Sequence, residues 1–149
     1  LGAFLSIHLF SNFAGSDNFY DWGGVAKHSP LAGVLTTVFF FSLAGIPPLG
    51  GWFAKFVVFR SLLSTGEIVG ISLAIIGAIN AVIALVYYAR ISKVIWMDEL
   101  KNPEQEQTFE FQNPLKVVGA FTVLITFIAG VFPGIFSYLG EVSSIFFGN

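Results

Sequence analysis

One stretch of the chain, FSLAGIPPLGGWFAKF from Phe41 to Phe56, combines residue types that could take up and release a proton in apolar surroundings. The adjacent prolines Pro47 and Pro48 lack backbone N–H donors, and Pro48 disfavours the α conformation at Pro47, so a helix is expected to break here. Such a break leaves unpaired backbone N–H and C=O groups that can hold water or orient charge. Lys55 follows within about one helical turn and adds a group that can take up and release protons.

The predicted break consists of small residues and prolines: Gly45, Pro47, Pro48, Gly50 and Gly51. Lys55 is the predicted proton-transfer residue, although its neighbours from Trp52 to Val58 are apolar. A charged side chain inside a membrane helix costs on the order of 3 kcal/mol, so we expect it to face a polar cavity or a partner. The hypothesis places that partner, a buried acid or histidine, upstream of Leu1. Two plainer interpretations stay open: Lys55 reaches the membrane surface as an anchor, or the prolines form an ordinary loop between two helices.

The composition predicts a membrane protein. Of 149 residues, 55% are hydrophobic and 11% are charged, against about 25% charged in soluble domains, and the mean hydropathy is +0.80. The net charge of −2 gives no indication of nucleic-acid binding, and the absence of cysteine excludes disulfides and thiolate metal sites. The chain starts with the apolar run LGAFLSIHLF and has no initial Met. We therefore expect a C-terminal fragment of a longer protein, beginning in the tail of a helix.

The expected fold class is all-α, with polytopic transmembrane helices of which one is discontinuous. Charge-free runs from Ile68 to Ala89 and from Val117 to Gly140 each suit a membrane helix. We expect one membrane domain, 1–149, divided as follows: helix tail 1–11, interfacial loop or short surface helix 12–29, broken helix 30–65, helix 67–97, polar loop 98–113, helix 114–140 and tail 141–149.

The lysines and arginines predict the orientation of these segments. Arg90, Lys93, Lys101 and Lys116 flank or lie in the polar loop, and such residues favour the cytoplasmic side. If residues 31–65 cross the membrane once, residues 11–30 lie on the same side.

Several other polar residues have structural interpretations. We expect Asn80 to bridge helices rather than bind an ion, Arg60 to reach the interface, and Glu67 to be a solvated residue favoured by a helix N-terminus. The remaining candidates are expected to pack between helices or lie at the interface: His8, His28, Tyr87 and Tyr88.

The pattern S-L-A-G-I-P-P-L-x-G-x-x-x-K, ending at Lys55, resembles the broken helix of the antiporter-like membrane subunits of respiratory complex I, and subunit N most of all. The following VYYARISKVIWMDE resembles the end of the next helix in that subunit, and the order of segments is also similar. The resemblance implies that Lys55 belongs to a proton path. Its other members, a glutamate and lysines on earlier helices, would lie upstream of Leu1.

The resemblance further implies a proton-translocating membrane subunit of NADH-quinone oxidoreductase, which couples quinone reduction to proton transfer. It would be an enzyme only as a subunit, without a redox active site. NAD, FMN, iron–sulfur clusters and quinone would belong to partner subunits. The expected surroundings are other membrane subunits and the lipid bilayer of the inner (plasma) membrane, which the chain would cross several times. The alternatives are a subunit of a multisubunit Na⁺/H⁺ (Mrp-type) antiporter and a purely structural membrane subunit.

Overall fold

The computed structural model describes residues 2–99, 113–135 and 138. The described part is all-α, as predicted, and contains no strand. Along the described residues the main elements are α1 (Gly2–Ala14), the 3₁₀ helix η1 (Phe19–Trp22), α2 (Val25–His28), α3 (Pro30–Ala44), α4 (Gly50–Ser64), α5 (Ile68–Met97) and α6 (Asn113–Val131).

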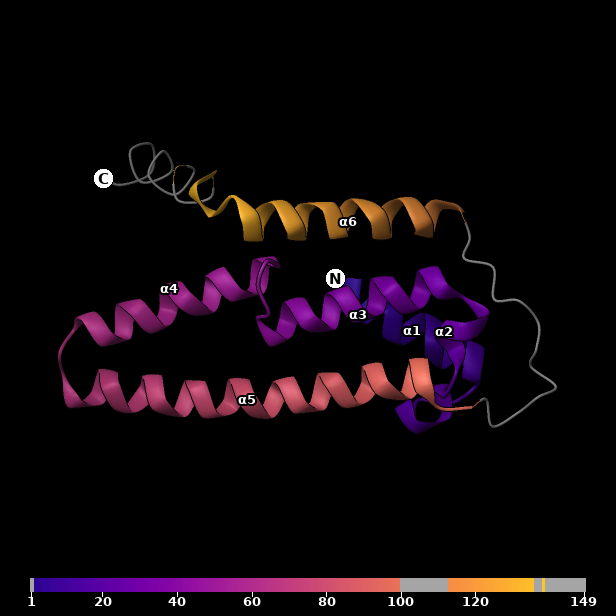
Figure 1. The fold of residues 1–149 in the computed structure, drawn as a ribbon, viewed down its shortest axis with the longest axis horizontal. Helices are drawn as coiled ribbons and strands as arrows, with labels where there is room; N and C mark the ends of the chain where they lie inside the picture. Colours follow the sequence, from indigo (N-terminus) through magenta and orange to yellow (C-terminus); the bar gives the residue numbers. More distant parts are fainter. Residues whose placement is uncertain (1, 100–112, 136–137, 139–149) are drawn as a thin grey trace.

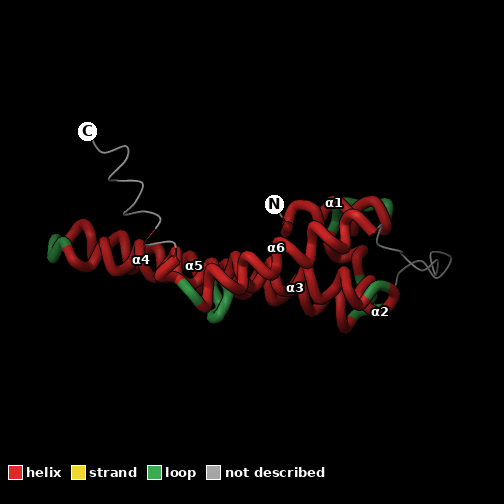
Figure 2. The backbone as a smooth tube through the Cα atoms, turned by 90° about the horizontal axis from the view of Figure 1, so that it is seen from above, coloured by secondary structure: helices red, strands yellow, loops and turns green. Residues whose placement is uncertain are grey.

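The discontinuous helix lies at the centre of the arrangement. Figure 1 shows α3 and α4 running end to end in one direction, while α5 returns beside both of them. The α6 helix lies along the other side of α3 and α4, and α1 packs against α3. The view from above agrees, with α4 at one end of the elongated molecule and α1, α2 and α3 at the other (Figure 2). Residues 30–64 therefore make one broken passage rather than a hairpin of two.

The α5 helix is the part of the described chain that is long and apolar enough to cross a membrane by length and composition. Its 30 residues span about 45 Å at 1.5 Å per residue. Glu67 occupies its N-cap position, is exposed and makes no side-chain capping bond. The helices Pro30–Ala44 and Lys116–Val131 are apolar but shorter.

A buried core ties α1, α3 and the end of α5 together. Phe10, Phe40 and Ile95 are fully buried in it, and Trp22 joins them edge-on to Phe10. The region around α2 is fastened to the C-terminal end of α5, because the Gly24 N–H donates to the Val94 carbonyl at 3.3 Å. Residues 16–29 and the end of α5 thus lie at the same end of the molecule.

Two segments differ from the expected division. Over 12–29, where a loop or a short surface helix was expected, α1 continues to Ala14, and the short helices η1 and α2 follow. The side chain of Asn18 caps η1 by accepting from the Tyr20 N–H, which favours a short helix over an open loop. In the segment expected to be one helix over 114–140, α6 ends at Val131 and residues 133–135 are helical again, because Pro133 cannot donate to the carbonyl four residues earlier. Most of the expected loop 98–113 and all of tail 141–149 lie outside the described residues.

Candidate functional site

The α3 helix ends at the predicted break in a left-handed glycine cap. Gly45 has φ +86°, a conformation that favours glycine. Its N–H contacts the carbonyls of Phe41 and Ser42 at 3.1 and 3.0 Å, and the Ile46 N–H donates to Phe41 at 3.0 Å. This pattern satisfies two of the carbonyls that a helix end leaves without partners.

Lys55 satisfies a third carbonyl of the α3 end. Its Nζ donates to the Ala44 carbonyl oxygen at 2.6 Å, reaching from α4 back across the break. An ammonium group is favoured there, because the C-terminal end of a helix carries partial negative charge. The Lys55 side chain lies over Gly45, where a Cβ atom would come within 2.8 Å of Lys55 Cδ. Gly45 therefore both ends α3 and leaves room for the lysine.

The start of α4 lies against the end of α3 with little space between them. A Cβ on Gly51 would overlap the Ser42 carbonyl oxygen and approach the carbonyl carbon to 2.8 Å. Leu49 occupies the N-cap position without a side-chain capping bond, so the first N–H groups of α4 face the break. Pro47 and Pro48 are exposed, and the peptide bond between them is cis.

The far side of the break is covered by α6. A Cβ on Gly50 would lie 3.1 Å from Ala129 Cβ, and Gly130 abuts the Pro48 carbonyl. The Trp52 indole N–H donates to the Gly130 carbonyl at 3.1 Å. Glycine at positions 50 and 130 allows α6 to approach the broken segment this closely.

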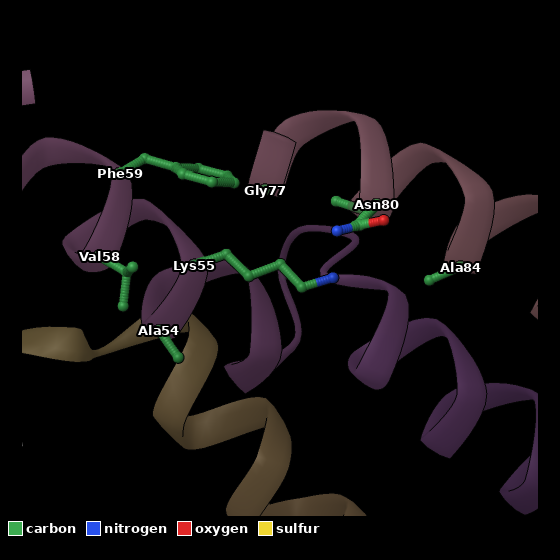
Figure 3. A pocket seen from close by; sticks show the side chains of 8 residues that line it. Ala54, Lys55, Val58, Phe59, Gly77, Asn80 and Ala84 are labelled. Carbon is green, nitrogen blue, oxygen red and sulfur yellow. The ribbon is translucent and has the colours of Figure 1, made fainter. Parts of the chain in front are cut away.

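On the other side, α4 and α5 line an open cavity of about 430 Å³. Six of its eight lining residues are apolar or glycine, and the other two are Lys55 and Asn80. Figure 3 shows the ammonium group of Lys55 and the amide of Asn80 pointing into this space from opposite helices. The site therefore combines one cation, one amide and a broken helix end within largely apolar walls.

The structure brings the predicted break residues and Lys55 together and adds Asn80 to them, whereas the remaining candidates lie elsewhere. His8 is exposed on α1, where its Nε2 lies 3.1 Å from Asn12 Nδ2. Arg60 is exposed beyond Lys55 on α4 and lines a separate hollow with Phe56 and Leu63.

The remaining candidates lie near the α2 end of the molecule. Tyr88 stacks on Phe40 with ring centroids 5.5 Å apart, and Tyr87 meets Phe19 edge-on. His28 ends α2 and is half-buried. The described residues contain no group of His, Cys, Asp or Glu that could hold a metal ion.

Sequence reasoning missed two features of the site. It did not foresee that a backbone carbonyl of this chain, at Ala44, accepts from Lys55; the acid or histidine expected upstream of Leu1 stays a prediction. It expected Asn80 to bridge helices but did not foresee that Asn80 lines the same cavity as Lys55. One signal was present, because Asn80 is the one polar side chain between Leu73 and Val86.

These features define an all-α membrane protein with a discontinuous helix, in which a lysine of the second half donates to the last carbonyl of the first half. The chain belongs to the family described as "NADH:quinone oxidoreductase/Mrp antiporter, TM", whose profile matches residues 1–84.

Proteins called NADH-quinone oxidoreductase subunit N are similar over most of the chain. The relative from Moorella thermoacetica is 35% identical over 89% of this chain and 27% of its own length. The relative from Heliobacterium modesticaldum is 29% identical over 97% of this chain and 29% of its own length. Subunit N 2 of Chloroherpeton thalassium is 33% identical over 96% of this chain and 28% of its own length. The chain thus spans less than a third of the length of these relatives.

Proposed function

We propose that this chain is part of a proton-translocating membrane subunit of an NADH-quinone oxidoreductase, and that Lys55 carries the proton past the helix break. The observation that carries the proposal is the position of Lys55. Its ammonium group binds the last carbonyl of α3 at 2.6 Å and borders a cavity whose other walls are nearly all apolar. Relatives named as subunit N support the choice of complex.

The chemistry at Lys55 is a reversible proton transfer. In the charged form, one N–H of the ammonium donates to the Ala44 carbonyl, and the remaining two N–H groups are free to bind water in the cavity. Loss of one proton to such a water leaves a neutral amine with a lone pair, which can accept the next proton. Because the surroundings are apolar, the charge on a neighbouring group strongly affects which form is favoured. A charge change elsewhere in the subunit can thereby load or unload Lys55.

The proposal places the chain within a larger assembly. It would contribute to the enzyme only as a subunit, while NAD, FMN, iron–sulfur clusters and quinone bind to partner subunits. The neighbours would be other membrane subunits and lipid of the inner (plasma) membrane, with the chain crossing it several times. Arg90 and Lys93 at the end of α5 favour the cytoplasm for that end of the molecule.

A subunit of a multisubunit Na⁺/H⁺ antiporter is the second candidate, because the matching family description includes the Mrp antiporters. The two functions differ in what drives the proton. Proton uptake by vesicles that depends on NADH and quinone supports the first, and uptake that depends on a Na⁺ gradient supports the second.

The test uses the full-length protein in its assembled complex, with Lys55→Ala and Lys55→Arg as variants. Both are expected to lower proton pumping by about tenfold or more, since a positioned proton-transfer group typically contributes a factor of about 10² to 10⁴. Arginine keeps the charge but does not release its proton near neutral pH. Pumping and quinone reduction are measured in vesicles and normalised to assembled complex.

Arg60→Lys is the matched control, because Arg60 is an exposed cation on the same helix and does not line the cavity. It should pump like the wild type. If Lys55→Arg also pumps at the wild-type rate, Lys55 is a fixed charge or a surface anchor, and the proposal is wrong.

A further inference from the structure

The cavity between α4 and α5 contains a second polar group for which the proposed function has no role. Asn80 lies near the middle of α5 and projects into the cavity opposite Lys55 (Figure 3). Within the described part of the chain, its amide has no hydrogen-bond partner. Asn80 is exposed in the described part of the chain, but it lies near the middle of α5, which is long and apolar enough to cross a membrane. In hydrocarbon, where no water can bind it, an amide without a hydrogen-bond partner costs about 1–3 kcal/mol. A hydrogen-bond partner would remove that cost, and among the residues that line the cavity the other polar side chain is Lys55.

We propose that Asn80 is the positioning residue for Lys55, and that its amide binds the lysine in both protonation states, directly or through one water. This inference rests on the proposed function. An ammonium group has three donors and no acceptor, whereas a neutral amine has two donors and one lone pair. The asparagine amide offers a carbonyl oxygen to the first and N–H donors to the second. The Ala44 carbonyl can only accept: it binds the charged form more strongly than the neutral one and offers nothing to the lone pair of the neutral amine.

Asparagine fits this role better than a charged residue. An aspartate opposite Lys55 would hold the lysine in its charged form, because opposite charges at close range favour ionisation. A leucine would leave the neutral amine without a donor. A residue that serves both forms lowers the difference in free energy between them and keeps the lysine able to exchange its proton.

The helices packed around Lys55 bring no other ionisable group to the cavity. Within their described ranges, α3 has no ionisable side chain, α6 has Lys116, and α4 has Arg60 besides Lys55. Glu67 lies at the N-cap of α5, and the ionisable side chains within α5 start at Tyr87. None of these side chains lines the cavity. The pH dependence of proton transfer at this site should therefore respond to a change at position 80.

The test compares Asn80→Leu, Asn80→Asp and Asn80→Gln in the full-length protein within its complex. Proton pumping is measured across pH and normalised to assembled complex. Asn80→Leu should lower the rate about tenfold, and Asn80→Gln should restore most of it. Asn80→Asp is nearly isosteric, so it tests the idea even if leucine disturbs assembly. It should move the pH profile upward by about one unit or more, because an opposing carboxylate shifts a partner's ionisation by about 1–3 units.

Ser72→Leu is the matched control, since Ser72 is exposed on the same helix, bonds its own backbone at Ile68 and does not line the cavity. It should leave rate and pH profile unchanged. Combining Asn80→Leu with Lys55→Ala should cause no loss beyond that of Lys55→Ala alone, because a residue that acts through Lys55 has no further effect once the lysine is gone.

The outcomes separate this inference from the proposed function. If Lys55→Ala abolishes pumping while Asn80→Leu and Asn80→Asp keep the wild-type rate and pH profile, the inference about Asn80 is wrong and the function of Lys55 stands. If Lys55→Ala pumps normally, the proposed function is wrong, and the role of Asn80 is refuted with it. Additive losses in the double variant would show that Asn80 acts independently of Lys55.

Discussion

Replacing Gly51 by alanine tests the close approach of the two halves of the broken helix. The added Cβ would overlap the Ser42 carbonyl oxygen and lie 2.8 Å from the carbonyl carbon. A flexible side chain could rotate away from such a contact, but Ser42 meets it with backbone atoms of the last α3 turn. The variant must therefore separate α3 from α4, or tilt one of them.

Two opposing effects decide the size of the change in the free energy of unfolding. Alanine in place of glycine inside a helix stabilises by about 0.5–1 kcal/mol, because it restricts the unfolded chain. Extra volume in a well-packed site destabilises by about 1–3 kcal/mol. Since the contact involves backbone, we place the second effect in the upper part of its range and expect a net loss of about 1–2 kcal/mol for Gly51→Ala.

The assay is SDS-induced unfolding of the purified full-length protein in mixed micelles, followed by tryptophan fluorescence. Gly134→Ala is the matched control, because a Cβ at Gly134 meets nothing within 4 Å, and it should not destabilise. A Gly51→Ala protein that is as stable as the wild type, or more stable, would refute the close packing of α3 against α4.

Two further predictions concern the elements around the break. Trp52→Phe removes the indole donor to the Gly130 carbonyl and should cost about 0.5–1.5 kcal/mol in the same unfolding assay; an unchanged stability would mean that this bond does not hold α6 to the break. Because α3 and α4 run in one direction, single cysteines at Ser16 and Thr65 should react with a membrane-impermeant maleimide from opposite sides of the membrane. Labelling of both from one side would contradict a single broken passage.

The sequence predicted those parts of the fold that depend on local backbone chemistry. The break follows from two residues without N–H groups, and the glycine that ends α3 lies just before them. The extent of α5 was equally visible, because a long charge-free run leaves few alternatives. By contrast, the short helices η1 and α2 depend on a cap at Asn18 and on packing against α5, neither of which has a strong periodic pattern.

The candidate site was predicted in its residues but not in its contacts. Lys55 stood out as a cation among apolar neighbours, whereas its acceptor, the Ala44 carbonyl, is a backbone atom that no side-chain pattern can reveal. The pairing of Lys55 with Asn80 across one cavity depends on how α4 and α5 pack, and 25 residues separate the two in sequence. The sequence shows an isolated amide in an apolar helix, but the packing of α4 against α5 is needed to show that this amide lines the same cavity as Lys55.

The uneven surroundings of the break determine which part of it can move. On one side α6 presses backbone against backbone at Pro48 and Gly130; on the other side lies the open cavity. We therefore expect the helix ends at the break to stay in place while the Lys55 side chain changes rotamer. Rotamer changes take picoseconds to nanoseconds, whereas helix movements take microseconds to milliseconds. Proton passage at the break would then be far faster than a typical enzyme turnover of about 1–10³ per second, so the timing of the pump would be set elsewhere.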